Sequence, residues 1–105
     1  MTTVFQRVGR FEILSEIGRG GMASVFLAED TESHQRVALK LVPIRDDREG
    51  REILEAERWG ARLQARLSAE CPLVPKVYED GDHPPYYFIA MEYVGGENLS
   101  DFNAR

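Results

Sequence analysis

Alternating apolar and polar positions mark three short segments in the first half of the chain. Residues 11–17 (FEILSEI), 24–29 (SVFLAE) and 36–42 (RVALKLV) have apolar side chains at or near every second position, the period of a half-buried strand. The glycine-rich segment 18–23 and the polar segment 30–35 separate them, and Pro43 ends the third. The pattern predicts three consecutive antiparallel strands.

A helical pattern replaces this alternation over residues 46–68, which contain no proline and are rich in Glu, Arg, Ala and Leu. Steps of three and four residues separate the apolar positions and give one apolar stripe along a helix. The stripe consists of Ile53, Ala56, Gly60, Leu63 and Leu67. We expect a solvated face on the other side, which carries three arginines at positions 58, 62 and 66.

Two more strands are predicted after the helix, which Pro72 and Pro75 bring to an end. They cover residues 74–79 and 86–93, with the segment Asp80-Gly81-Asp82 as the turn that follows the first. Gly95-Gly96 reads as a flexible joint, and residues 98–105 begin a further helix. We therefore expect an α+β fold in which one long helix packs against a five-stranded antiparallel sheet.

Composition narrows the possible functions. The chain has 105 residues, so it forms one domain at most, and its net charge of −5 disfavours binding to nucleic acid or to anionic lipid. Cys71 is the single cysteine, which excludes an internal disulfide and a thiolate zinc cluster, and we predict no metal site. No apolar run is long enough to cross a bilayer, and residues 1–7 do not resemble a secretory signal, so we expect a cytoplasmic location.

The segment 18–25 (GRGGMASV) is the first candidate for chemistry. It lies between two predicted strands, whereas the glycines of a dinucleotide-binding turn lead from a strand into a helix. A glycine-rich hairpin of this kind can cover a polyphosphate, because small residues let backbone N–H groups approach it. Taken alone, the segment fits a phosphate-binding loop and a plain tight turn equally well.

Lys40 strengthens the phosphate interpretation. The chain has eleven arginines and two lysines, yet a lysine stands in the third predicted strand among apolar neighbours. A compact ammonium group can enter a cleft and meet a phosphate as a point charge. The alternative is a lysine that extends from the edge of the sheet into solvent.

The order of these motifs resembles the N-terminal lobe of a protein kinase, of the serine/threonine type found in bacteria. The glycine-rich hairpin is followed by VALK at 37–40, by a helix that carries glutamates, and by MEYVGG at 91–96. The resemblance extends from about Phe11 to Phe102. One departure is Ala23, which stands where the family has a third glycine.

This resemblance implies an ATP site. Gly18, Gly20 and Gly21 would cover the phosphates, and Lys40 would hold the α- and β-phosphates while pairing with a helix glutamate. Met91 falls at the gatekeeper position, behind the adenine. The other implied adenine and ribose contacts are Val25 and Ala38 above the ring, the backbone of Glu92 and Val94 at its edge, and Glu97 at the ribose.

Two glutamates compete as the partner of Lys40. At about 100° per residue, Glu57 lies close to Ile53 on the helix, whereas Glu55 points away from the apolar stripe. The sequence of residues 55–59 (EAERW) also resembles a kinase helix in which Glu55 is the partner of Lys40. We predict Glu57, with Glu55 as the alternative.

Several parts of a complete kinase do not occur in this sequence. The resemblance implies an N-terminal extension (1–10), a kinase N-lobe (11–94), and a hinge with the start of the first C-lobe helix (95–105). A catalytic H-R-D loop and a D-F-G segment do not occur. Asp101-Phe102-Asn103 lies only ten residues after Met91 and reads as the first turn of a helix. With the C-terminal lobe absent, the residues that would hold Mg²⁺ are absent too, and we expect this chain alone to be inactive.

Three functions are compatible with these observations. The first is the ATP-binding lobe of a kinase that phosphorylates serine and threonine hydroxyls of proteins. The second is a kinase-like module for binding or regulation, which could self-associate through an uncovered apolar face of the lobe. The third is a fragment of a small-molecule phosphotransferase, which the sequences of the glycine-rich hairpin and of segment 91–96 disfavour. The sequence leaves the protein substrate, the preference for serine/threonine or tyrosine, and the oligomeric state open.

Overall fold

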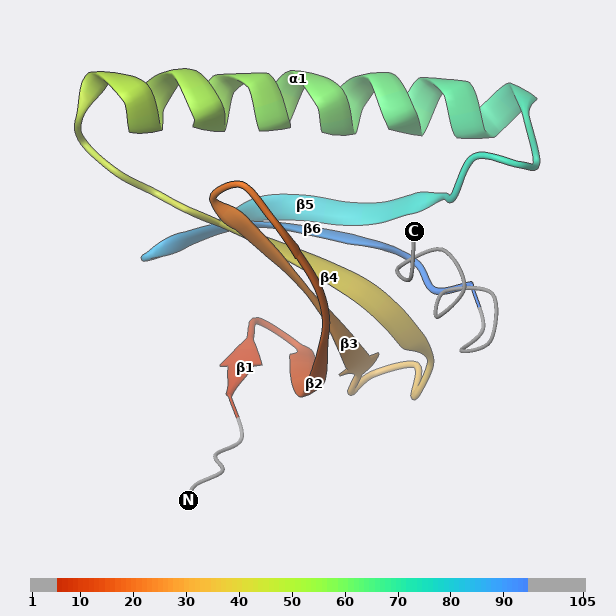
Figure 1. Ribbon diagram of the computed structural model, residues 1–105. Coiled ribbons are helices and arrows are strands. Elements are labelled where there is room, and N and C mark those ends of the chain that lie inside the picture. Colours follow the sequence, from red (N-terminus) through yellow and green to blue (C-terminus); the bar gives the residue numbers. More distant parts are fainter. Residues whose placement is uncertain (1–5, 95–105) are drawn as a thin grey trace.

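The computed structural model describes residues 6–94, which form one antiparallel sheet and one long helix (Figure 1). The sheet has six strands in the order β1-β2-β3-β4-β6-β5. The elements are β1 (Arg7–Val8), β2 (Phe11–Gly20), β3 (Ala23–Asp30), β4 (Arg36–Pro43), α1 (Arg48–Glu70), β5 (Val77–His83) and β6 (Tyr86–Glu92). The α+β fold is therefore confirmed.

The sheet has six strands instead of the five that the sequence predicts. The additional strand is β1, whose two residues pair with the start of β2, Val8 opposite Phe11. Val8 is buried in the core, so part of the segment expected to be an N-terminal extension contributes to the sheet. Two residues are too few for an alternating pattern to be visible in the sequence, which is why the strand was missed.

The turn between the last two strands also lies elsewhere than predicted. Asp80, Gly81 and Asp82 are inside β5, where they pair with residues of β6, and the chain reverses at Pro84-Pro85. Strand β5 is at the edge of the sheet, and its exposed side tolerates the polar residues that resemble a turn in the sequence.

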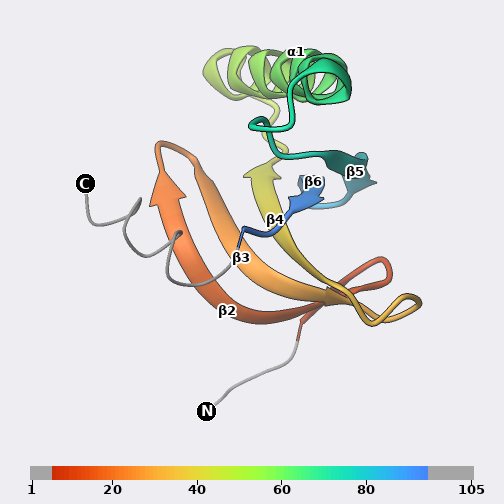
Figure 2. The same ribbon diagram turned by 90° about the vertical axis from the view of Figure 1, so that its right-hand side faces the viewer.

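The sheet is strongly curved, and the helix covers only one end of it. In Figure 2, α1 lies over β4, β5 and β6, whereas the β2–β3 hairpin bends away. One cluster of buried side chains lies inside the curved sheet, and a second lies between α1 and the sheet. The space beside the hairpin, next to the second cluster, is where the candidate site lies.

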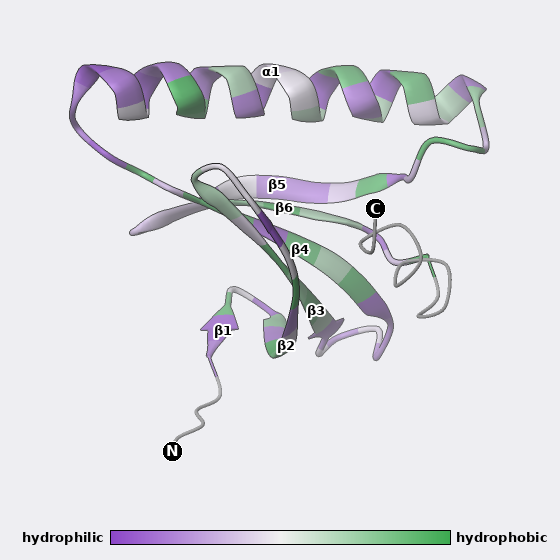
Figure 3. Ribbon diagram, in the orientation of Figure 1, coloured by the Kyte–Doolittle hydropathy of each residue, from purple (hydrophilic) through white to green (hydrophobic). Residues whose placement is uncertain are grey.

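Of its predicted apolar stripe, the helix packs only Ile53 on the sheet. Gly50 and Ala61 are its buried residues, whereas Leu63 and Leu67 of the stripe are 45% and 48% exposed. The side that faces the sheet includes the half-buried polar residues Glu57 and Gln64. Apolar and polar residues thus alternate irregularly along the helix (Figure 3). Among the described residues, no helix has the length and apolar character needed to cross a membrane.

Candidate functional site

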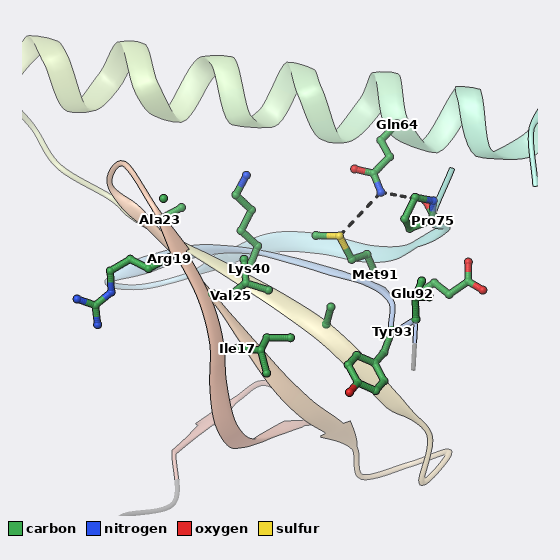
Figure 4. A pocket seen from close by; sticks show the side chains of 14 residues that line it. Ile17, Arg19, Ala23, Val25, Lys40, Gln64, Pro75, Met91, Glu92 and Tyr93 are labelled. Atoms are coloured by element: carbon green, nitrogen blue, oxygen red, sulfur yellow. Dashed lines mark hydrogen bonds between the residues drawn. The ribbon is translucent and has the colours of Figure 1, made fainter. Parts of the chain in front are cut away.

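A cavity of about 600 Å³ opens between the β2–β3 hairpin, the middle of β4 and the end of β6 (Figure 4). This volume is within the range of small-molecule sites. Eight of the residues predicted from the sequence line it: Gly18, Gly20, Val25, Ala38, Lys40, Met91, Glu92 and Val94. Residues from four strands therefore meet at one place, although they are far apart in the sequence.

Three other predicted residues lie outside the wall of this cavity. Gly21 is at the exposed tip of the hairpin, Glu57 contacts Lys40 from α1, and Glu55 is exposed on α1. Glu97, predicted at the ribose, lies outside the described residues, as does the segment 101–103.

The structure gives different accounts of the glycines at positions 20 and 21 of the hairpin. Gly21 has a φ of +57°, a left-handed conformation that favours glycine at the turn. Gly20 has no such φ, and a Cβ at this position would meet no heavy atom within 4 Å. The chain itself therefore gives no steric reason for glycine at position 20, and the missing side chain leaves open space at the cavity wall.

Lys40 belongs to a central strand, so it does not extend from the edge of the sheet. Strand β4 lies between β3 and β6, and Lys40 is opposite Val25 on one side and Ile89 on the other. Its neighbours Leu39 and Leu41 are buried inside the curved sheet, so the alternation of the strand directs Lys40 to the opposite face. That face carries the cavity and α1.

The structure pairs Lys40 with Glu57. The distance from Lys40 Nζ to Glu57 Oε1 is 2.9 Å, and the two side chains are 28% and 25% exposed. Glu55 is exposed because two residues along a helix turn the side chain by about 200°. In this structure Glu57, and not Glu55, is the helix glutamate that contacts Lys40.

The apolar part of the cavity lies next to this ion pair. Ala38 of β4 is opposite Met91 of β6, and Val25 comes from β3 on the hairpin side. The backbone N–H of Glu92 donates to the carbonyl of Lys76 at 2.7 Å. Arg19 also lines the cavity, but it is paired with Glu16 at 3.0 Å and points to solvent.

Sequence reasoning missed some residues of the cavity wall, among them Ile17, Gln64, Pro75 and Tyr93. Gln64 comes seven residues after Glu57, which is two helical turns, so the same face of α1 carries both. That spacing was a usable signal. Among the described residues, no group of three or more His, Cys, Asp or Glu side chains is arranged to hold a metal ion.

Comparisons with known proteins agree with this geometry. The chain is 36% identical over 94 residues to the serine/threonine-protein kinase PrkC of Bacillus subtilis, and 31% identical over 93 residues to the serine/threonine-protein kinase pkn2 of Myxococcus xanthus. These matches cover 90% and 89% of this chain but 14% and 11% of the two kinases. No model of a known protein family matches the chain.

The fold has a counterpart among solved structures. The structure described as "PpkA-294 apo form" superimposes with a TM-score of 0.75 at 20% identity. The match covers 96% of this chain and 42% of the other, so the chain corresponds to less than half of that protein. In sequence and in fold, the chain is a protein-kinase-like N-terminal lobe of the bacterial serine/threonine type.

Proposed function

We propose that this chain is the ATP-binding lobe of a protein kinase that transfers phosphoryl groups to serine and threonine hydroxyls of proteins. The observation that carries the proposal is the Lys40–Glu57 ion pair, 2.9 Å long, at the wall of a cavity bordered by a glycine-rich hairpin. A cation that a carboxylate holds in place is suited to bind a polyphosphate, because phosphate oxygens are strong acceptors for charged donors.

The phosphate end of the nucleotide belongs beside Lys40 and beneath the hairpin. Lys40 holds the α- and β-phosphates, and Glu57 keeps the ammonium group in position. The open space at Gly20 supports close approach of the hairpin backbone to the phosphates. Gly18 and Gly21 complete the covering loop.

The adenine ring belongs in the apolar part of the cavity. Val25 and Ala38 cover one face of the ring, and Met91 stands behind it. Since the Glu92 N–H already donates to Lys76, the carbonyl of Glu92 is its available backbone contact for the adenine edge, together with the backbone of Val94. Glu97 is assigned to the ribose by the resemblance alone.

The remaining chemistry needs groups that this sequence does not contain. Phosphoryl transfer requires Mg²⁺ to neutralise charge on the phosphates and an aspartate to orient the hydroxyl. Neither an H-R-D loop nor a D-F-G segment occurs in the chain. We therefore expect this chain alone to bind nucleotide without turning it over, with the cytoplasm as the place where it meets ATP. Lys40-dependent turnover by the isolated chain would contradict this.

Calorimetric titration of Mg-ATP into four proteins tests the proposal. Wild type should bind, and Lys40→Met and Glu57→Gln should bind at least about tenfold more weakly, because each breaks a charge-assisted contact. Glu55→Gln removes the same charge two residues away and should bind as wild type does. Equal affinity in all four proteins, or no binding by wild type, would refute the assignment.

A second candidate is a module that binds a second copy of itself, and the outer side of α1 favours it. Trp59 is 65% exposed on α1, as are Leu63 and Leu67 in part, and Leu73 just after the helix is 90% exposed. Apolar side chains gathered on one face often mark an interaction surface. Light scattering at rising protein concentration tests this, and a monomer at all concentrations would exclude it. In the event of dimerisation, Trp59→Lys should restore the monomer.

A further inference from the structure

The side chain of Gln64 connects three separate parts of the molecule at the back of the cavity. Its amide nitrogen Nε2 donates to the carbonyl oxygen of Pro75 at 2.9 Å and contacts the Met91 sulfur at 3.8 Å. Figure 4 shows both contacts, with Gln64 reaching down from α1 to the strand that carries Met91. One side chain thus links the helix, the segment before β5 and β6.

The contacts of Gln64 lie at a weakly packed junction. Ala61, about one helical turn before Gln64, is the nearest buried residue of α1. Leu63 and Leu67 of the same helix are substantially exposed. While the Gln64 amide donates to the Pro75 carbonyl, it is restricted to orientations that reach this partner. An apolar side chain of similar size would pack here without fixing any orientation.

Met91 is a residue that needs such a restraint. Methionine is unbranched and has several rotatable bonds, so it fills irregular gaps in more than one conformation. Met91 is opposite Ala38, and both line the cavity. Because the side chain of Ala38 is small, the conformation of Met91 determines how deep the cavity is. The Gln64 amide, as a hydrogen-bond donor next to the Met91 sulfur, favours one conformation of the Met91 side chain.

We propose that Gln64 is a positioning residue that sets the depth of the nucleotide pocket. By holding the Met91 sulfur and the Pro75 carbonyl together, it keeps Met91 across the back of the pocket. The pocket then accepts an unsubstituted adenine amino group and rejects adenines that carry a large group there. This inference rests on the proposed function, since it assumes that adenine occupies the apolar part of the cavity.

Methyl NMR tests the restraint without any ligand. The chain contains three methionines, so a protein labelled with ¹³C-methyl methionine gives few signals, and Met91→Leu assigns the one of interest. In Gln64→Leu and in the nearly isosteric Gln64→Glu, which lacks the donor when ionised, the Met91 signal should move toward that of a freely rotating methionine. Arg66→Gln, on the exposed side of the same helix, should leave it unchanged. An unchanged signal in both Gln64 variants would overturn the proposal.

Nucleotide selectivity provides the second readout. Affinities for ATP and for N⁶-benzyl-ATP are measured for wild type, the two Gln64 variants and Arg66→Gln. The ratio of the two affinities should shift by about fivefold toward the benzyl analogue when Gln64 loses its donor, as expected for the loss of one hydrogen bond. A ratio equal to that of wild type would overturn the proposal. If wild type binds no ATP, the proposed function fails, and the methyl signal still decides whether Gln64 restrains Met91.

Discussion

The two apolar clusters of this molecule are built in different ways. The cluster inside the curved sheet has eight buried residues and draws on five of the six strands, with the rings of Phe11 and Phe88 5.8 Å apart. The cluster under the helix has five buried residues, of which Ala61 alone comes from α1. The sheet is thus held together by its own side chains, whereas the helix contributes one buried apolar residue and the partly buried Ile53 and Leu54.

The polar contacts around the clusters differ in the same sense. Arg10 spans the curved sheet from Asp30 at 2.9 Å to Glu79 of the edge strand, and so closes the first cluster. Around the second cluster, three side chains of α1 make separate polar contacts. Glu57 pairs with Lys40, and Arg58 pairs with Asp82 at 2.8 Å. Gln64 donates to the carbonyl of Pro75, just before β5. The position of the helix therefore depends on these polar contacts as well as on apolar packing, and two of the polar contacts are also parts of the candidate site. Weakly packed elements of this kind are where ligand-dependent movement is expected.

Removing a large side chain from the sheet cluster should have the largest effect. Phe11 is 1% exposed, and Phe11→Ala should reduce the free energy of unfolding by about 3 to 5 kcal/mol, which is enough to unfold a chain of this size. Urea denaturation followed by circular dichroism measures this. Leu63→Ala on the exposed side of α1 is the matched control, with an expected change within about 0.5 kcal/mol. Similar losses in both variants would show that the two regions do not differ as described.

Enlarging the one buried helix side chain in the second cluster should separate the helix from the sheet. Ala61 is 4% exposed and packs in the cluster of Val42 and Tyr87, so Ala61→Leu should cost about 1 to 3 kcal/mol through overpacking. The same variant should bind Mg-ATP more weakly, because Glu57 moves away from Lys40. Ala65→Leu, on an exposed part of the helix, should change neither property. Normal ATP affinity in a destabilised Ala61→Leu protein would argue against the coupling.

The closing contact of the sheet should make stability depend on acid pH. Burial raises the pKa of Asp30, but hydrogen bonds from Arg10 and from two backbone N–H groups outweigh burial and hold the pKa below its ordinary value of 3.8. A carboxyl whose pKa is lowered by folding stabilises the protein fully above its unfolded pKa and loses this effect as the pH falls through the folded pKa. Asp30→Asn should therefore lose about 1 to 2 kcal/mol at pH 7, and the difference from wild type should shrink below about pH 4.

Urea titrations of both proteins at pH 7 and at pH 3 measure this difference. Glu32→Gln, which neutralises an exposed carboxyl two residues away, should leave the stability nearly unchanged at both values. A difference between Asp30→Asn and wild type that persists at the lower pH would contradict the explanation.

The smallest effect is expected at the buried tyrosine under the helix. The Tyr87 hydroxyl donates to Asp80 at 2.7 Å, and Arg58 lies over its ring at 4.6 Å from the centroid. Tyr87→Phe should cost about 1 kcal/mol, since one hydrogen bond is lost and Asp80 can turn to water. Thermal unfolding measures the change, with the exposed Tyr78→Phe as control. Burial and the hydrogen bond raise the pKa of Tyr87, so its contribution should persist until the pH exceeds the ordinary tyrosine value of 10.0.

Where an element has a strong period and a clear end, the sequence predicted it closely. The three alternating segments became β2, β3 and β4, with β4 ending at Pro43, and the long helix lies within two residues of its predicted ends. Short or polar strands were harder. The two residues of β1 carry no period, and the acidic, glycine-containing middle of β5 resembles a turn, although edge position and pairing with β6 make it a strand.

For the candidate site, the sequence by itself determined the set of chemical groups. Glycines before a strand, a lysine among apolar residues and a helix that carries glutamates are visible in the sequence alone, and the first two depart from their local pattern. Only the tertiary structure decided how they are used. It directed Lys40 to the helix side of a central strand, chose Glu57 over Glu55, and brought Gln64 to Met91 across 27 positions. These choices depend on strand register and on the rotation of the helix against the sheet, which long-range packing fixes and local sequence periods do not.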